Sequence, residues 1–396
     1  MVISKNMEAL VAGSSTIRKL FEEGLHLAAE VGAENVYDFS LGNPAAPVPA
    51  KVTQAIKDIL AENPDSYVHG YMKNAGFDEV RSNVANSLNK KFDMGYGPED
   101  IVMTVGAAGA MNCVFRALLG YEDEVIAFAP YFGEYRSYVA NYGGILKVVP
   151  AKLDDFDLNL DELDALINEK TKCVIVNNPN NPSGKVYPAA TLQKLADILE
   201  KAEKRVGHPI YVIADEPYRE LVYDGDEVPY IPSIIKNSIY MYSFSKTLSL
   251  PGERIGYMAL SKRMDYYEEM IGAMVVANRC LGYINAPSLF QLVVSRCLDV
   301  DVDLEFYDKN RKLLYSKLTE LGFEVVKPQG AFYLLVKSPY ENEEEFVKAA
   351  KKNHIILVST KTFGCPGYVR IAYCVDYKMI ERSLPAFEQL AKDCGL

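Results

Sequence analysis

Short apolar runs alternate with helical segments through the middle of this chain, and that alternation restricts its fold more than any other feature. Six runs of four or five residues follow one another between positions 101 and 242. Such runs, with helices between several of them, are typical of a parallel sheet that is covered by helices. We therefore predict an α/β fold. The predicted strands are 101–105, 125–128, 146–149, 173–176, 210–214 and 239–242, with a candidate antiparallel strand at 257–260.

Both ends of the chain have a different pattern. Near the start, a helix that Ser14 or Ser15 can cap is predicted from Ile17 to Val31, because apolar residues recur there at three- and four-residue spacing. Near the end, a long helix at 301–321 precedes shorter elements. The other predicted helices are 52–60, 77–92, 110–119, 191–205, 265–274, 286–298 and 343–352, and the other strands are 322–325, 332–336 and 369–373.

These patterns predict two domains in 396 residues. We expect a large domain at 51–300, with a mostly parallel seven-stranded sheet. We expect the N-terminal arm, 1–50, and the C-terminal segment, 301–396, to form a smaller α+β domain.

Composition excludes several classes of function. With 49% hydrophobic and 24% charged residues, the chain is typical of a globular protein, and a net charge of −11 gives no support to nucleic-acid or anionic-membrane binding. The first residues lack the features of a signal peptide, and no run is long enough to span a bilayer. We therefore expect a cytoplasmic protein.

Seven cysteines and four histidines give no sign of a metal site. The cysteines are odd in number and contain no Cys-x-x-Cys pair, and the histidines lie far apart in the sequence. We predict neither a disulfide framework nor a bound metal.

The strongest chemical signal follows the run at 239–242. Lys246 lies beside Ser243 and Ser245, and Arg254 follows eight residues later. A deprotonated lysine forms a Schiff base with an aldehyde, while two hydroxyls and an arginine can hold a phosphate, so this set points to pyridoxal phosphate. Taken alone, Lys246 would more often be one of 42 basic residues on a solvated surface.

Two further polar residues follow earlier runs at matching spacing. Asn181 precedes Asp215 by 34 residues, and Asp215 precedes Lys246 by 31, which is about one strand-helix-strand unit each time. In parallel sheets, ligands bind beyond the carboxyl ends of the strands, so the three side chains should meet there. A buried Asp215 would be costly without a cation such as a pyridinium nitrogen.

Weaker signals lie at other strand ends and near the start of the chain. The Gly106-Ala107-Ala108-Gly109 turn opens a predicted helix and suits a phosphate, although such turns are about as often structural. Phe132 offers a ring for stacking on a flat heterocycle, but a core aromatic is the more frequent meaning. Gly42 permits close approach of the backbone to a ligand, or simply a tight turn.

The joint order of four motifs resembles that of the class I and II aminotransferases, pyridoxal phosphate enzymes with the aspartate aminotransferase fold. The motifs are Asn181-Pro182-Ser183-Gly184, Asp215-Glu216-Pro217-Tyr218, Ser243-Phe244-Ser245-Lys246 with Arg254, and Val369-Arg370-Ile371. The resemblance covers nearly the whole chain, and its specificity comes from the joint order and spacing. It implies an enzyme that moves an amino group from an L-amino acid to a 2-oxo acid by a ping-pong mechanism.

The resemblance also implies a role for each site residue. Lys246 would be the Schiff-base lysine and proton shuttle, and Asp215 would pair with the pyridine nitrogen. Asn181 and Tyr218 would bond the ring oxygen. The phosphate would be held by Ser243, Ser245, Arg254, the Gly106-Ala107-Ala108 turn and, from the neighbouring subunit of a homodimer, Tyr71. Phe132 would stack on the cofactor ring. Arg370, Gly42 and Asn181 would bind the substrate.

Two departures and two alternatives accompany this prediction. Ser183 stands where the family commonly has threonine, and Ala107-Ala108 replaces a turn that often contains a hydroxyl. The alternatives are a lyase of the same fold that eliminates a β-substituent, and a non-catalytic regulator. Substrate choice stays open, because Arg370 would contact only the α-carboxylate, which all amino acids share. We give equal weight to three places for Arg279: against a distal substrate carboxylate, against the cofactor phosphate, or in solvent.

Overall fold

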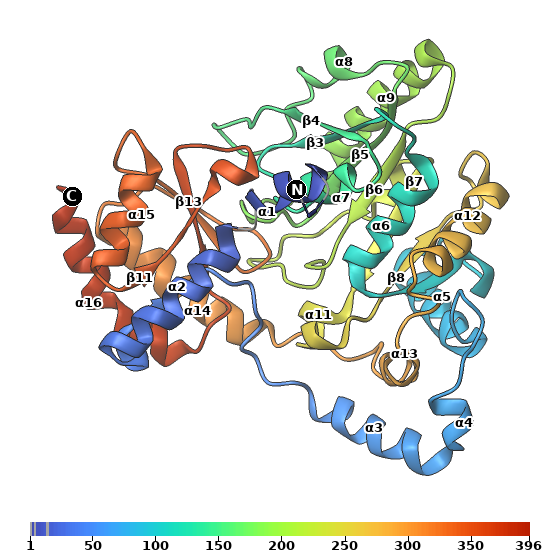
Figure 1. Cartoon of the computed structure of the whole chain (residues 1–396), viewed down its shortest axis with the longest axis horizontal. Helices are drawn as coiled ribbons and strands as arrows, with labels where there is room; N and C mark the ends of the chain where they lie inside the picture. Colours follow the sequence, from blue (N-terminus) through green and yellow to red (C-terminus); the bar gives the residue numbers. More distant parts are fainter. Residues whose placement is uncertain (1, 4, 13–15) are drawn as a thin grey trace.

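The computed structural model describes residues 2–3, 5–12 and 16–396. The predicted capping residues Ser14 and Ser15 lie outside the described residues, and the helix they were expected to cap is α2 (Thr16–Val31). The described chain contains a seven-stranded sheet, a four-stranded sheet and a two-stranded pair (Figure 1). No helix among the described residues is long and apolar enough to cross a membrane.

The seven-stranded sheet confirms the prediction of a mostly parallel α/β fold. Its strand order is β2-β8-β7-β6-β5-β3-β4, in which β8 runs antiparallel to both neighbours and the pairs from β7 to β4 are parallel. The candidate antiparallel strand at 257–260 is therefore confirmed as β8. The strands are β2 (Ile101–Thr104), β3 (Glu124–Phe128), β4 (Ile145–Val149), β5 (Thr171–Asn177), β6 (Tyr211–Asp215), β7 (Ser238–Ser243) and β8 (Gly256–Leu260).

Helices cover both faces of this sheet because alternate strand residues point to opposite sides. In β5, Val174 and Val176 belong to the apolar cluster that includes α5, α9 and α13, whereas Cys173 and Ile175 belong to the cluster that includes α6 and α12. The helices are α3 (Ala50–Glu62), α4 (Asp65–Val68), α5 (Asp78–Phe92), α6 (Gly106–Leu118), α7 (Tyr135–Ala140), α8 (Leu163–Leu166), α9 (Ala189–Val206), α10 (Ile231–Ile234), α11 (Phe244–Thr247), α12 (Tyr267–Cys280) and α13 (Ser288–Ser295).

The second core joins the two ends of the chain. β1 (Tyr37–Asp38) pairs in parallel with β11 (Ile355–Ile356), and Figure 1 shows the blue α2 among the red C-terminal elements. Beside this pair lies an antiparallel sheet of order β12-β13-β10-β9. Its strands are β9 (Val325–Val326), β10 (Tyr333–Lys337), β12 (Val358–Ser359) and β13 (Tyr368–Ala372), and α14 (Leu304–Glu320), α15 (Glu343–Lys352) and α16 (Tyr377–Asp393) pack on this sheet or on the β1-β11 pair. Helix α1 (Lys5–Ala12) precedes α2 in the chain.

Three details differ from the sequence prediction. The strand expected at 322–325 is the two-residue β9, because Gly322 turns the chain at a φ of 90°. The helix expected at 265–274 extends to Cys280, so that Asn278 and Arg279 lie in its last turn. Helix α16 was not predicted, although its buried residues follow a helical period around the internal Pro385. The exact domain boundaries stay a prediction.

Candidate active site

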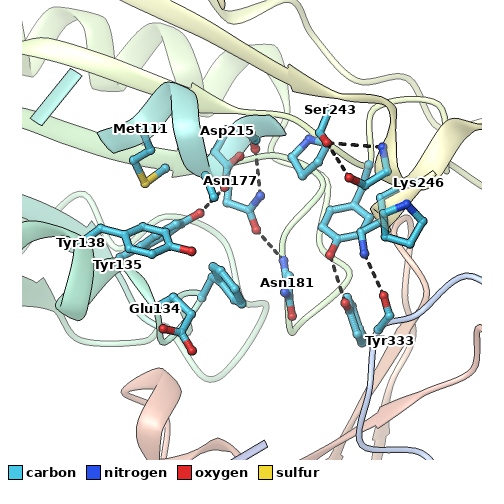
Figure 2. Close-up of a pocket in the computed structure, with 18 of the residues that line it drawn as sticks. Met111, Glu134, Tyr135, Tyr138, Asn177, Asn181, Asp215, Ser243, Lys246 and Tyr333 are labelled. Atoms are coloured by element: carbon cyan, nitrogen blue, oxygen red, sulfur yellow. Dashed lines mark hydrogen bonds between the residues drawn. The ribbon is translucent and has the colours of Figure 1, made fainter. Parts of the chain in front are cut away.

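A cavity of about 350 Å³ opens at the carboxyl ends of β5, β6 and β7, and the four-stranded sheet closes its other side (Figure 2). Lys246, Asp215 and Asn181, which the spacing argument expected to meet, all line it. Gly106 and Tyr71 do not. The other predicted site residues that line the cavity are Gly42, Ala107, Ala108, Phe132, Tyr218, Ser243, Ser245, Arg254 and Arg370.

Lys246 lies in α11, the single helical turn that follows β7. Its Nζ donates a hydrogen bond of 2.7 Å to the backbone oxygen of Gly42, which joins the N-terminal segment to the cavity. Burial lowers the pKa of Lys246 to about 8, and the positive charges of Arg370 and Arg254 act in the same direction. The amine is therefore neutral in a substantial fraction of molecules near pH 8, which is the form needed for nucleophilic work.

Asp215 is the last residue of β6, and only 7% of it is exposed. Burial raises its pKa to about 6, which the hydrogen bond from Tyr135 partly opposes. Tyr135, in the first turn of α7, donates to Oδ2 of this carboxylate. Since no ion pair to Asp215 is present among the described residues, its charge is left for a cation in the cavity.

One end of the cavity has the features of a phosphate site. Ser243 caps α11 by accepting from the Ser245 backbone N–H, and the two hydroxyl oxygens lie 2.8 Å apart. Opposite them, α6 begins at Gly106, so Ala107 and Ala108 lie in its first turn with free backbone N–H groups. Gly106 has a φ of 67°, a left-handed conformation that favours glycine, and a Cβ there would also lie 2.8 Å from Nη2 of Arg254.

Arg370 comes from β13 in the four-stranded sheet and is 2% exposed. Its Nη2 donates to the Ser40 backbone oxygen at 2.6 Å, and its Nη1 donates to Oδ1 of Asn181 at 3.2 Å. The buried Nε has no partner among the described residues. Because a buried guanidinium donor without an acceptor is costly, this side chain is suited to an anion such as a carboxylate.

Asn181 and Tyr218 form the remaining wall. The backbone N–H of Asn181 donates to Oδ1 of Asn177, whose Nδ2 in turn donates to the backbone oxygen of Asp215. The Tyr218 hydroxyl lies 3.0 Å from that of Tyr333 in β10. These bonds hold the Asn181 backbone and the Tyr218 hydroxyl, and both residues line the cavity with Lys246. Figure 2 shows Asn177, Asn181, Lys246 and Tyr333 around this part of the site.

Sequence reasoning missed several cavity residues. Asn177 ends β5 as Asp215 ends β6, so the rule of inspecting strand ends could have found it. Tyr135 follows Phe132 by one helical turn, which is a weaker signal, and only the pairing of β10 with β13 brings Tyr333 to the site. Arg279, left open by the sequence, is exposed and does not line the cavity of its own chain.

Comparison with known families gives the chain its class. The model of the class I and II aminotransferases matches residues 33–387. This range includes both sheets and all the cavity residues described above. The chain therefore belongs to the class I and II aminotransferase family, and it is an aminotransferase.

Individual relatives differ in the substrates that their names carry. An aminotransferase from Eubacterium rectale has a solved structure that is 44% identical, covers 100% of both chains and superposes with a TM-score of 0.97. An aspartate aminotransferase from Pyrococcus abyssi is 30% identical over 96% of each chain. An aromatic-amino-acid aminotransferase from Thermococcus litoralis is 29% identical over 99% of each.

Proposed function

We propose that this protein is a pyridoxal phosphate-dependent aminotransferase that moves an amino group from an L-amino acid to a 2-oxo acid by a ping-pong mechanism. The observation that carries the proposal is the joint presence, in one cavity, of a lysine with a lowered pKa, a buried carboxylate without a cation and an arginine with a free Nε. The cofactor would supply an aldehyde for the lysine and a positively charged ring nitrogen for the carboxylate, and an amino acid would supply a carboxylate for the arginine.

The donor set fits the cofactor at each of its polar groups. Ser243, Ser245, Arg254 and the first turn of α6 would hold the phosphate. Asp215 would pair with the ring nitrogen, and the attraction between opposite charges is stronger in a buried site than in water. Tyr218 and Asn181 would donate to the ring oxygen, and Phe132 would stack on the ring.

When bound, pyridoxal phosphate supplies an aldehyde that captures amines and a ring that withdraws electrons from the substrate α-carbon. Lys246 would hold the cofactor covalently through Nζ until the substrate amine displaces it. Its freed Nζ would then take the proton from the α-carbon, since its pKa of about 8 suits a base that works near neutral pH. Arg370 would hold the α-carboxylate through Nε and a terminal nitrogen, while Asp215 keeps the ring nitrogen positively charged.

The test of this function is a panel of amino donors assayed with 2-oxoglutarate and pyruvate as acceptors. Wild-type enzyme should transfer amino groups and show a visible absorbance band, and Lys246→Ala should lose both because no other lysine of the described residues lines the cavity. Full transfer by Lys246→Ala would refute the assignment. Release of ammonia or sulfide without transfer would instead support the lyase alternative.

The proposal includes a cytoplasmic homodimer in which Tyr71 reaches the phosphate of the neighbouring subunit. Tyr71 is 92% exposed and does not line the cavity of its own chain, which is consistent with a role across an interface. A tyrosine suits such a place, because its ring gains buried area against a partner while its hydroxyl can reach a polar group. In the proposed homodimer, the neighbouring subunit would bury the Tyr71 ring and provide the phosphate site that its hydroxyl reaches.

A further inference from the structure

Tyr333 lies where the two sheets meet. It begins β10, is 2% exposed and lines the cavity. In the register of β10 with β13, Tyr333 pairs with Ala372 and Leu335 pairs with Arg370. Because alternate residues share a face, Tyr333 and Arg370 are diagonal neighbours on the same side of the sheet.

The ring of Tyr333 supports the arginine. The guanidinium carbon of Arg370 lies 4.5 Å from the centre of this ring and 5.2 Å from that of Phe363. A guanidinium on an aromatic face is attracted by the π electrons, and more strongly where water is excluded. The ring therefore holds Arg370 from one side while Ser40 and Asn181 accept its terminal nitrogens.

The hydroxyl of Tyr333 serves a different residue. It lies 3.0 Å from the Tyr218 hydroxyl, which is its only hydrogen-bond partner among the described residues. A phenol has one proton to donate. When Tyr218 gives its proton to an oxygen in the cavity, it can only accept from Tyr333. A bond donated in this way makes Tyr218 the stronger donor, since hydrogen bonds in a chain polarise one another.

Gly42 makes room for this arrangement. A Cβ at Gly42 would lie 2.0 Å from the Tyr333 hydroxyl oxygen and 3.0 Å from its ring carbon Cζ. The same residue accepts the bond from Lys246. The Tyr333 side chain is thus packed against the backbone that accepts the hydrogen bond from Lys246, and it has little room to move.

We propose that Tyr333 is a positioning residue that orients two separate groups of this site, Arg370 through its ring and Tyr218 through its hydroxyl. Through these two contacts, one side chain would support both the arginine of the four-stranded sheet that would bind the substrate carboxylate and the tyrosine at the seven-stranded sheet that would bind the cofactor ring oxygen. This inference rests on the proposed function, and it assigns to β10 a part in the reaction that the sequence motifs do not include.

Two substitutions separate the ring from the hydroxyl. Tyr333→Phe keeps the ring and should leave KM for the amino donor within about twofold, while kcat falls by up to about tenfold for one lost hydrogen bond. Tyr333→Leu removes both and should also raise KM by about two- to thirtyfold, the range of a cation-π contact. Tyr211→Phe is the matched control, because it removes one tyrosine hydroxyl that bonds the Asp265 backbone oxygen away from the cavity.

A spectroscopic measurement on the loaded enzyme gives a readout other than turnover. In Tyr333→Phe, the pH midpoint of the visible absorbance band should move upward, because a weaker Tyr218 donor leaves the ring oxygen more basic. In a Tyr218→Phe background, Tyr333→Phe should change neither the midpoint nor kcat, since the hydroxyl would act only through Tyr218.

The outcomes distinguish this inference from the proposed function. A wild-type enzyme with neither turnover nor a visible band would refute the function itself. With an active wild type, an unchanged midpoint and kcat in Tyr333→Phe, or an equal effect in the Tyr218→Phe background, would overturn the role of the hydroxyl. Unchanged KM in a folded Tyr333→Leu would overturn the role of the ring. If the leucine variant fails to fold, Tyr333→Met, which also lacks an aromatic ring, tests the role of the ring in its place, and the phenylalanine variants still decide the role of the hydroxyl.

Discussion

Asp215→Asn should stabilise the cofactor-free protein while it weakens cofactor binding. The substitution removes the charge of a carboxylate that is 7% exposed, and asparagine keeps an oxygen that can accept the hydrogen bond from Tyr135. Burial without a cation is the main reason that the pKa of Asp215 rises from 3.8 to about 6. The charged side chain therefore opposes folding, and it is retained for a ligand rather than for stability.

The size of the effect follows from this pKa. A shift of about two pH units corresponds to about 3 kcal/mol, at about 1.4 kcal/mol per unit, that the ionised carboxylate costs the folded state. The sign follows from proton uptake: the folded state binds the proton more tightly, so the cost is fully present above pH 6 and disappears as the pH falls below 3.8. The uncharged asparagine of the variant has no such cost at any pH.

Urea unfolding of the cofactor-free protein measures this difference. At pH 8, the free energy of unfolding should be up to about 3 kcal/mol higher for Asp215→Asn than for wild type, and the gap should shrink between pH 6 and pH 4. Added pyridoxal phosphate should stabilise the variant less than wild type, because its ring nitrogen has lost its counter-charge. The exposed Asp161→Asn should change neither quantity.

Two results would refute the reasoning. Equal stability of wild type and Asp215→Asn at pH 8 would mean that the buried carboxylate is already compensated. A stability gap that persists unchanged at pH 4 would mean that the gain comes from packing or from the hydrogen bond rather than from removal of a charge.

Two other perturbations test the substrate and the interface. Arg370→Lys should lower kcat/KM by about 10- to 150-fold, through a higher KM, because lysine cannot replace the planar donors that meet Ser40, Asn181 and a carboxylate. Initial rates over a range of amino-donor concentrations measure this effect. A loss of kcat/KM below threefold would contradict a role for Arg370 in binding the carboxylate. Mixing Lys246→Ala with Tyr71→Ala subunits should restore activity above that of either variant alone, because each hybrid dimer would contain one site with both residues intact. If hybrid dimers are verified by their mass and activity does not rise on mixing, Tyr71 is not shared across the interface.

The sequence by itself determined the large sheet and the reactive set. The buried strands of the parallel sheet appear in the sequence as apolar runs, and β8 was predicted as an added run of the same kind. Lys246, Asp215 and Asn181 meet in one cavity because parallel strands bring their carboxyl ends to one edge, so spacing along the chain becomes proximity in space. The local sequence pattern was sufficient to predict the position of a residue wherever that position followed directly from the strand that precedes it.

The tertiary structure decided what depends on contacts between distant segments. Tyr135 reaches Asp215 across 80 residues, and Tyr333 reaches Tyr218 across 115 residues and Gly42 through close packing. No periodicity in the sequence encodes these pairs, because each joins residues from different elements that only the folded chain brings together. The same is true of the charge states, since desolvation of Asp215 and Lys246 depends on the whole shell of neighbours and not on the motifs that contain them.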